Sequence, residues 1–405
     1  MKKKIIIAIT IVLVMLVMVT GVFYWEQLRG IWPAILKPQH NIVPLLETAS
    51  TTGSSPLHIP SGFSLSIFAK ELDDPRVMIF DPVGTVLVSI PSRGEVLALS
   101  DANHDGIADQ PVIVAQGLNR PHGLALQCGK PDCTLFIAEE SRVAAYSYDT
   151  YSKKATLKKV LTTLPTGGNH TTRSLLLYEG KLLVSAGSSC NVCRESGQDR
   201  ANIRQIDLSS DEVKTFATGL RNAVFMAVNP HSGAIWATEM GRDLLGDDIP
   251  PDELNIIKEG ANYGWPICYG KNIHDTAFDT NIYIRNPCME PFETPSYIDI
   301  PAHSAPLGLA FIPASWPARY KNDLLVAYHG SWNRSIPTGY KIVRYRFDDK
   351  GTYQGVEDFM TGWLTKDGSA LGRPVGIIIS DDGTTYISDD KAGVIYRLEP
   401  PKQQR

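Results

Sequence analysis

Six short apolar segments recur along the chain, and each is followed by a polar turn and a second β-rich segment. They begin 46 to 83 residues apart: PRVMIF at 75–80, PHGLAL at 121–126, TRSLLL at 172–177, AVFMAV at 223–228, PLGLAF at 306–311 and PVGIII at 374–379. Periods of this size are typical of four-stranded propeller blades, and the longer gaps indicate insertions. Six units predict an all-β fold, a six-bladed β-propeller over residues 58–398, with no separate domain inside that span.

The composition agrees with a folded protein and excludes one class of partner. Hydrophobic residues make up 43% of the 405 residues and charged residues 20%, as in ordinary globular proteins. The net charge of -4 gives no basic surface of the kind that nucleic acids require, so we expect no nucleic-acid partner.

The N-terminus predicts a transmembrane helix. Lys2 to Lys4 precede an uncharged apolar segment that extends through Trp25. About 20 such residues suffice to cross a bilayer, and no A-x-A cleavage site follows. Lysines before the span keep the N-terminus in the cytoplasm. We therefore expect residues 1–25 to be a membrane anchor, or else a cleaved signal, with the rest on the extracytoplasmic (periplasmic) side, anchored to the inner membrane or secreted.

Residues 26–57 are expected to be a linker between this helix and the propeller. Turn-forming residues are frequent there. They are Pro33, Pro38, Pro44 and a Thr/Ser/Gly cluster at 48–55.

The six cysteines form three groups that are close in sequence: Cys128 with Cys133, Cys190 with Cys193, and Cys268 with Cys288. Six cysteines allow fifteen connectivities, but an exported chain with local pairs favours local disulfides. The C-N-V-C spacing is also compatible with a redox or zinc half-site, although no second C-x-x-C or histidine pair completes a zinc set. We predict three local disulfides, the first two at the mouth of the channel and the third across the large insertion at 240–300.

Polar residues come just before the inner strands in five of the six units. If those strands line a central channel, these residues meet at one mouth of it, and such convergence predicts a functional site. They are Asn119-Arg120, His170-Thr171, Arg221-Asn222, His303-Ser304 and Arg373.

Histidine is the residue type best suited to act there as a general base, because its ordinary pKa of about 6.5 is close to the working pH. On the residues alone, His122, His303 and His329 rank nearly level with His170. A lone surface histidine in the Gly-Gly-Asn turn at 167–169 is the plainer alternative for His170.

Six longer stretches together carry a family resemblance: LPTGGNHTTRSLLL, GLRN at 219–222, TEMGRD followed by DELNIIKEGANYGWPICYG, AHSAPLGLAF, HGSWNRSIPTGYKIVRY and GRPVGIIISDDGTTYISDDKAGVIYRL. Over residues 58–398 the chain resembles the soluble PQQ-dependent sugar dehydrogenases (the glucose/sorbosone dehydrogenase family), most closely the L-sorbosone dehydrogenase-like branch. The resemblance implies an enzyme that oxidises an aldose or a related sugar or alcohol by hydride transfer to PQQ, with Ca²⁺ anchoring the cofactor.

The resemblance also implies roles for individual residues. His170 would be the general base that removes the substrate hydroxyl proton. Arg221 and Asn222 would contact the quinone oxygens, and Arg221 would stabilise charge as the cofactor is reduced. PQQ carries three carboxylates, so arginines are needed. Arg373 and Arg334, the latter in place of a family lysine, are the cofactor-binding candidates, together with Asn169 beside the base.

Two calcium sites follow from the same resemblance. The backbone carbonyls of Gly241 and Arg242 match those that hold the Ca²⁺ bridging PQQ to the protein. Glu253 and the carbonyl of Tyr263 match a second, structural calcium site.

A third calcium site is suggested by the residues themselves. DANHDGIAD at 101–109 places hard oxygen ligands at alternate positions, as in a calcium loop. The candidate ligands are Asp101, Asn103, Asp105 and Asp109. Position twelve of the loop is Val112 instead of a bidentate Glu, so an Asx-rich turn between blades is the alternative.

Two other functions are compatible with a propeller. A calcium-dependent lactonase would need Glu and Asp at the starts of the inner strands to hold a metal that activates water, whereas this sequence has His and Arg there. A non-catalytic extracytoplasmic binding propeller would leave the cationic channel unexplained. Since the chain has no C-x-x-C-H motif for a covalent haem, a dehydrogenase here would need an external electron acceptor, a quinone or a cytochrome.

Overall fold

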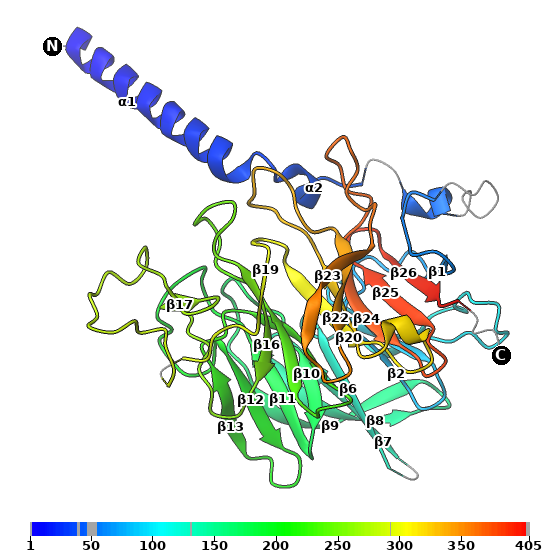
Figure 1. Ribbon diagram of the computed structural model, residues 1–405. Helices are drawn as coiled ribbons and strands as arrows, with labels where there is room; N and C mark the ends of the chain where they lie inside the picture. The colour runs from blue at the N-terminus through cyan, green and yellow to red at the C-terminus, as the bar shows by residue number, and fades with distance from the viewer. Residues whose placement is uncertain (1, 39–40, 47–54, 130–131, 292, 402–405) are drawn as a thin grey trace.

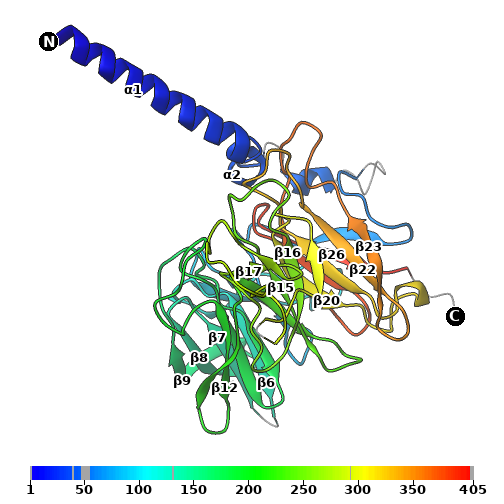
Figure 2. The same cartoon turned by 60° about the vertical axis from the view of Figure 1, so that its left-hand side comes forward.

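Six antiparallel sheets surround a central axis and form a six-bladed propeller (Figures 1 and 2). The computed structural model describes residues 2–38, 41–46, 55–129, 132–291 and 293–401. Each blade has four strands. The six repeated apolar segments supply the innermost strands, so the fold predicted from the repeat is confirmed.

The first three blades follow the chain in order. Blade 1 contains β2 (Met78–Phe80), β3 (Val86–Ile90), β4 (Glu95–Leu99) and β5 (Val112–Ala115). Blade 2 contains β6 (Gly123–Cys128), β7 (Cys133–Ala138), β8 (Arg142–Asp149) and β9 (Lys154–Thr163). Blade 3 contains β10 (Leu175–Tyr178), β11 (Lys181–Ala186), β12 (Asn202–Asp207) and β13 (Val213–Thr218).

The next two blades carry the longer insertions. Blade 4 contains β14 (Ala223–Val228), β15 (Ile235–Glu239), β16 (Asp252–Ile257) and β19 (Ile298–Ile300), with the short pair β17 (Cys268–Tyr269) and β18 (Ile273–His274) in the connection between β16 and β19. Blade 5 contains β20 (Pro306–Phe311), β21 (Leu324–Tyr328), β22 (Lys341–Phe347) and β23 (Tyr353–Met360), with the 3₁₀ helix η2 (Ala318–Tyr320) between β20 and β21.

Blade 6 joins the two ends of the chain. It contains β24 (Pro374–Ile379), β25 (Thr385–Asp389), β26 (Val394–Glu399) and, as its outer strand, β1 (Ser64–Ala69). β1 pairs with β26 from Ser64 opposite Glu399 to Ala69 opposite Ile395. The repeat analysis did not identify this strand, because it precedes the first repeated segment.

Burial explains why the second strands are rich in apolar residues. All five residues of β3 and of β21 are buried, because these strands are covered by neighbouring blades on both faces. The outer strand β9 is instead mostly exposed, and its sequence KATLKKVLTT is correspondingly polar.

One end of the channel, called the mouth here, collects the residues that precede the inner strands. Each inner strand starts at this end, and each second strand ends there: Gly123 lies opposite Ala138, and Ala223 lies opposite Glu239. The loops between second and third strands therefore also lie at the mouth. The inner strands contact their neighbours around the ring, so the six sets of loops meet.

The three predicted disulfides are confirmed. Cys190–Cys193 lies in the β11–β12 loop at the mouth. Cys128–Cys133 joins the end of β6 to the start of β7 and therefore lies at the opposite end of blade 2, so the expectation that it shapes the mouth is wrong.

The third disulfide, Cys268–Cys288, closes the large insertion. Residues 240–251 of that insertion form a mouth loop. Residues 260–265 of the insertion hydrogen-bond to the end of β13 in blade 3. The insertion reaches the mouth loops through ion pairs of Arg242 with Asp275 (2.7 Å) and of Arg194 with Asp279 (3.6 Å).

The N-terminal helix α1 (Lys2–Phe23) projects from the propeller (Figure 1). It continues as the π-helix η1 (Tyr24–Leu28), and α2 (Trp32–Ile35) follows. The span Lys3–Glu26 has a mean hydropathy of 3.0 and buries none of its apolar window, so its length and composition allow it to cross a membrane.

The segment expected to be a linker packs on the propeller instead. Lys391 Nζ donates a hydrogen bond to the carbonyl of Ala34 (3.3 Å). Ile42 and Leu46 are 1% and 7% exposed and belong to the core cluster of blades 5 and 6 that also contains Trp363. The physical reason is that Ile42 and Leu46 remove apolar surface from water when they pack on the apolar side chains of blades 5 and 6. Apart from Ser55, the Thr/Ser/Gly cluster at 48–55 lies outside the described residues.

We predict that Ile42→Ala lowers the free energy of unfolding of the full-length chain by about 2–4 kcal/mol, because it leaves a cavity in a buried cluster. Leu45→Ala is the matched control, since Leu45 is 38% exposed, and it should change stability by about 0.5 kcal/mol or less. Urea unfolding in detergent measures both. Equal, small effects would mean that the segment is a free linker.

Candidate active site

A cavity of about 390 Å³ opens at the mouth of the channel. Its lining contains six residues that the sequence analysis placed at the mouth or assigned to the site: Asn169, His170, Arg221, Gly241, His303 and Arg373. It also contains His329, one of the alternative bases, and residues that were not assigned, of which the polar or aromatic ones are Asp243, Asp252, Ser331, Trp332 and Asn333. Mouth loops of blades 3 to 6 thus bring distant parts of the chain together.

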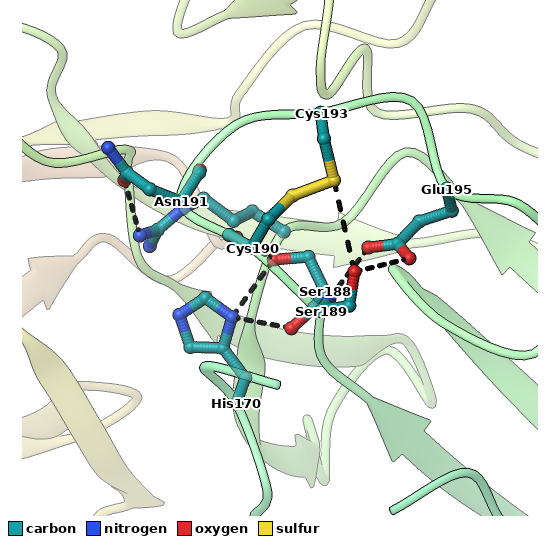
Figure 3. Close-up of a disulfide and its surroundings, with 8 residues drawn as sticks. His170, Ser188, Ser189, Cys190, Asn191, Cys193 and Glu195 are labelled. Carbon is teal, nitrogen blue, oxygen red and sulfur yellow. Dashed lines mark hydrogen bonds between the residues drawn. A yellow bond between two sulfur atoms is a disulfide. The ribbon is translucent and has the colours of Figure 1, made fainter. Parts of the chain in front are cut away.

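His170 is held through one ring nitrogen. Its Nδ1 lies 2.9 Å from both the carbonyl oxygen and the Oγ of Ser188 (Figure 3). A carbonyl can only accept, so Nδ1 carries the hydrogen, and Nε2 is left as an unprotonated acceptor. Burial and the neighbouring charge of Arg221 lower the pKa of His170 to about 3, so the ring is neutral at physiological pH.

The other candidate histidines either have a hydrogen-bonded Nε2 or lie outside the cavity lining. His303 Nε2 lies 2.6 Å from the carbonyl of Gly246, and His329 Nε2 lies 2.9 Å from Asp390. His122 is 1% exposed and is not part of the cavity lining. Among the histidines that line the cavity, His170 is therefore the one whose Nε2 has no hydrogen bond within the described residues.

Arg221 is fixed by a network around Asn191. Its Nε donates to the Asn191 carbonyl (2.8 Å), and Nη2 donates to Asn191 Oδ1 (2.9 Å) and to Asp243 Oδ2 (2.8 Å). The same Oδ1 accepts the backbone N–H of Asp243 (2.7 Å). A buried guanidinium needs such partners, and here they set its position in the cavity wall.

The Cys190–Cys193 disulfide constrains the loop that supplies these contacts (Figure 3). Ser188 Oγ donates to the carbonyl of Cys190 (2.7 Å), and Ser189 donates from its backbone N–H to Glu195 (2.6 Å). One short loop therefore positions His170 through Ser188 and Arg221 through Asn191.

Arg373 lies on the opposite arc of the ring, at the start of blade 6. Its Nε and Nη2 donate to the carbonyls of His329 (3.1 Å) and Gly330 (2.6 Å), and its guanidinium lies 5.5 Å from the centre of the Tyr340 ring. Carbonyl partners leave its positive charge without a directly bonded carboxylate, which suits a site for an anion.

Two of the sequence-based assignments do not line the cavity. Arg334 donates to Asp248 (2.7 Å) and to the carbonyl of Ala302 (3.3 Å), because the 329–340 loop turns its neighbours Trp332 and Asn333 inward instead. Asn222 is buried and donates from its backbone N–H to Glu239 (2.8 Å). Both are therefore corrected to positions outside the lining.

Oxygen donors form another part of the cavity wall. Asp252 is 3% exposed, and its two oxygens accept the backbone N–H groups of Gly241 (2.9 Å) and Ala305 (2.8 Å). Burial raises the pKa of Asp252 to about 7. A nearby cation would stabilise the ionised form of this buried carboxyl group.

A second, smaller cavity of about 20 Å³ lies behind this wall and is lined by Gly241, Arg242, Glu239, Glu253 and Tyr263. This volume is enough for one water molecule or ion. Arg242 thus lines the small cavity, not the large one.

The buried carboxyl groups of Glu239 and Glu253 line the small cavity, and Glu293, outside its lining, lies near Glu253. Burial raises the pKa of Glu253 to about 7 and, with the charge of Glu253, that of Glu293 to about 8. The same two causes raise the pKa of Glu239. Glu239 Oε2 and both carboxylate oxygens of Glu293 have no hydrogen-bond partner among the described residues. This oxygen-only donor set fits a hard divalent cation.

The loop at 101–109 does not gather its carboxylates. Asp101 accepts the backbone N–H groups of Asp105 and Gly106 (3.0 Å each), and Asp109 accepts that of Ala102 (2.9 Å). Within the described residues, its acidic side chains do not form a group of three or more whose ligand atoms all lie within 4.8 Å of one another. The hydrogen bonds fit an Asx-rich turn, and the calcium site assigned to Asp101, Asn103, Asp105 and Asp109 stays a prediction.

Some site residues were missed by the sequence analysis. Asp243 ends the TEMGRD stretch that carried the resemblance, so its proximity in sequence to Gly241 was an available signal. Asn191 lies between the two cysteines of C-N-V-C, where only its hydrogen bonds to Arg221 reveal a role.

Comparisons with known proteins place the chain among sugar-oxidising propellers. The TrAA12-like family model matches residues 57–401. An uncharacterized protein of Borreliella burgdorferi is 32% identical over 88% of this chain and 94% of its own length. A pyrroloquinoline quinone-dependent sugar dehydrogenase of Hypocrea jecorina is 27% identical over 84% of this chain and 88% of its own. The calcium structure of a Trichoderma reesei carbohydrate-active enzyme of family AA12 covers 85% of this chain and 96% of its own, with a TM-score of 0.72 at 24% identity, which shows a shared fold.

We predict that His170 stays neutral well below the ordinary histidine pKa of about 6.5. Because its pKa is lower in the folded chain than in the unfolded chain, the unfolded chain binds the proton first as the pH falls. The free energy of unfolding therefore decreases as the pH falls below about 6.5. NMR titration of the ¹³C-histidine-labelled, cofactor-free chain measures this. Arg221→Gln should raise the pKa of His170, because it removes a neighbouring positive charge. A titration midpoint near 6.5 for His170 in the unmodified chain would contradict the prediction.

Proposed function

The chain belongs to the TrAA12-like family, and from this premise we propose that it is a quinoprotein sugar dehydrogenase, an enzyme that oxidises an aldose or a related sugar or alcohol with bound PQQ. One observation carries the proposal: the mouth cavity combines a neutral imidazole, two arginines and a wall of oxygen donors. The sugar dehydrogenase of H. jecorina supports the same activity.

The cavity residues fit PQQ. This cofactor is planar and carries three carboxylates, and Arg221 and Arg373 supply two guanidinium charges in the lining. Trp332 supplies an aromatic surface, and a volume of about 390 Å³ lies within the range of small-molecule sites. Asn169, beside the base, adds an amide. PQQ, when bound, supplies a quinone that accepts a hydride from the substrate carbon.

The chain's own residues then manage protons and charge. His170 accepts the substrate hydroxyl proton at Nε2, while Ser188 keeps the proton on Nδ1 and so fixes the tautomer. Arg221, held by Asn191 and Asp243, stabilises negative charge that develops beside it, and it does so without reorganising. An anionic ligand in the cavity would offset the positive charge of Arg221 and raise the pKa of His170 toward the working pH.

Two calcium sites complete the proposal. The carbonyls of Gly241 and Arg242, with Asp252 beside Gly241, would hold the cation that anchors PQQ, because Gly241 lines both the large and the small cavity. Glu253 and the Tyr263 carbonyl would hold a structural Ca²⁺. Glu239 and Glu293 extend this ligand set, because their oxygens lack protein partners within the described residues.

We further propose that residues 1–25 are retained as a membrane anchor and that the propeller acts on the extracytoplasmic side. Electrons would leave to an external acceptor, a quinone or a cytochrome.

Reconstitution with PQQ and Ca²⁺ tests the function. We predict that His170→Ala lowers kcat by a factor of about 10²–10⁴ on a panel of aldoses with a soluble artificial acceptor, because positioned proton transfer is lost. PQQ binding, followed by absorbance, should persist. His303→Ala is the control, and it should keep turnover within a few-fold.

Two results would contradict the proposal. If the unmodified protein leaves the quinone absorbance unchanged on addition of every sugar, the chain is a binding propeller. If His170→Ala keeps full turnover while His303→Ala abolishes it, the base is misassigned.

We predict that removing divalent cations with a chelator lowers Tm by several degrees and that Ca²⁺ restores it. A ligand at 100 times its Kd stabilises the folded state by about 2.7 kcal/mol. Glu293→Gln should remove much of this gain, whereas Glu290→Gln, an exposed control in the same insertion, should not. Thermal unfolding with and without Ca²⁺ measures the difference, and an unchanged Ca²⁺ response in Glu293→Gln would exclude that residue as a ligand.

A further inference from the structure

The helix α1 is tied to the propeller at the mouth by a short connection. Gly30 is buried against the backbone carbonyls of Arg334 and Ser335, and a Cβ at this position would collide with the carbonyl oxygen of Arg334. Six residues, Tyr24 to Arg29, separate Gly30 from the last residue of α1. Even fully extended, the chain from Phe23 to Gly30 spans at most about 25 Å.

The anchoring point belongs to the loop that lines the cavity. Residues 329–340 connect β21 to β22, and His329 to Asn333 are part of the cavity lining. A second attachment comes from blade 6, where Lys391 donates to the carbonyls of Ala34 and Leu36. The end of α1 therefore cannot move from the mouth to another face of the propeller while these contacts hold.

Exposed apolar side chains gather on the same face. This mouth patch consists of Trp32 (47% exposed), Ile35 (57%), Leu244 (38%), Ile249 (46%), Trp332 (38%) and Ile336 (72%). Single exposed apolar residues are ordinary, but six of them on the loops and segment beside a membrane-length helix form a surface suited to lipid.

The helix end has the features of a membrane boundary. Tyr24 and Trp25 are 40% and 64% exposed, and the guanidinium of Arg29 lies 4.8 Å from the centre of the Trp25 ring. Tyrosine and tryptophan are enriched at the membrane–water interface, where a cationic side chain can also reach the headgroups.

We propose that the mouth face of the propeller lies against the surface of the lipid bilayer, with the mouth patch at the headgroup level. The inference rests on the proposed function in one respect, the retention of residues 1–25 as an anchor. Trp332 belongs to both the patch and the cavity lining, so the cavity opens toward the membrane interface. Substrate and electron acceptor then reach it from the space between protein and bilayer.

The test uses the full-length chain in phosphatidylcholine–phosphatidylglycerol vesicles. Ile336→Cys and Val83→Cys each receive an environment-sensitive fluorophore. Val83 is the matched control, since it is 67% exposed in the β2–β3 turn at the opposite end of the channel. We expect spin-labelled lipids to quench the label at position 336 several-fold more than the label at position 83.

Three outcomes would overturn the proposal. Equal quenching at the two positions would place the mouth away from the bilayer. Failure of the chain to float with vesicles would mean that residues 1–25 do not anchor it. Shielding of position 336 only when membrane proteins are added would indicate a protein partner. Sugar oxidation with a water-soluble acceptor, measured on the same vesicles, reports the proposed activity separately, so the two failures are distinguishable.

Discussion

The pairing of β1 with β26 is the contact on which the arrangement depends. It joins residues 64–69 to 395–399 and closes a ring of six sheets. Because each blade has four antiparallel strands, every inner strand begins at the same end, and closure brings side chains from blades 3 to 6 together in one cavity. It also brings the segment before β1 onto blades 5 and 6, where Ile42 and Leu46 are buried. The position of the N-terminal helix at the mouth is therefore a consequence of the same closure.

Within the cavity, precision comes from short-range hydrogen bonds on the β11–β12 loop. Burial of the imidazole, and after it the positive charge of the neighbouring Arg221, lower the pKa of His170, because both disfavour the protonated ring. The Cys190–Cys193 loop fixes both groups, through Asn191 for the guanidinium and through Ser188 for the imidazole. One disulfide-bonded loop thus holds both the neutral imidazole of His170 and the guanidinium of Arg221 in place.

The sequence predicted the architecture better than the details of the loops. Spacing in the sequence predicted the six inner strands and the three disulfides. It also predicted that His170, Arg221 and Arg373 meet, because strand direction is uniform in a propeller. The place of Arg334 outside the cavity lining was not predictable because the 329–340 loop has no period, and only its folded path shows that Trp332 and Asn333 line the cavity. Residues 26–57 were taken as a linker because prolines hid the buried apolar positions Ile42 and Leu46.

The charges of the site couple the binding of an anion to the binding of a cation. Arg221 and Arg373 attract an anion, but Asp243 and Asp252 line the same cavity, and Glu239 and Glu253 lie behind it. A trianionic cofactor placed against Asp252 would meet like charge in a low-dielectric environment, which is strongly unfavourable. A divalent cation at the Gly241 carbonyl reverses this, because it neutralises the carboxylate and adds attraction for the anion. On the proposed function, calcium at the cavity wall would therefore strengthen the binding of PQQ.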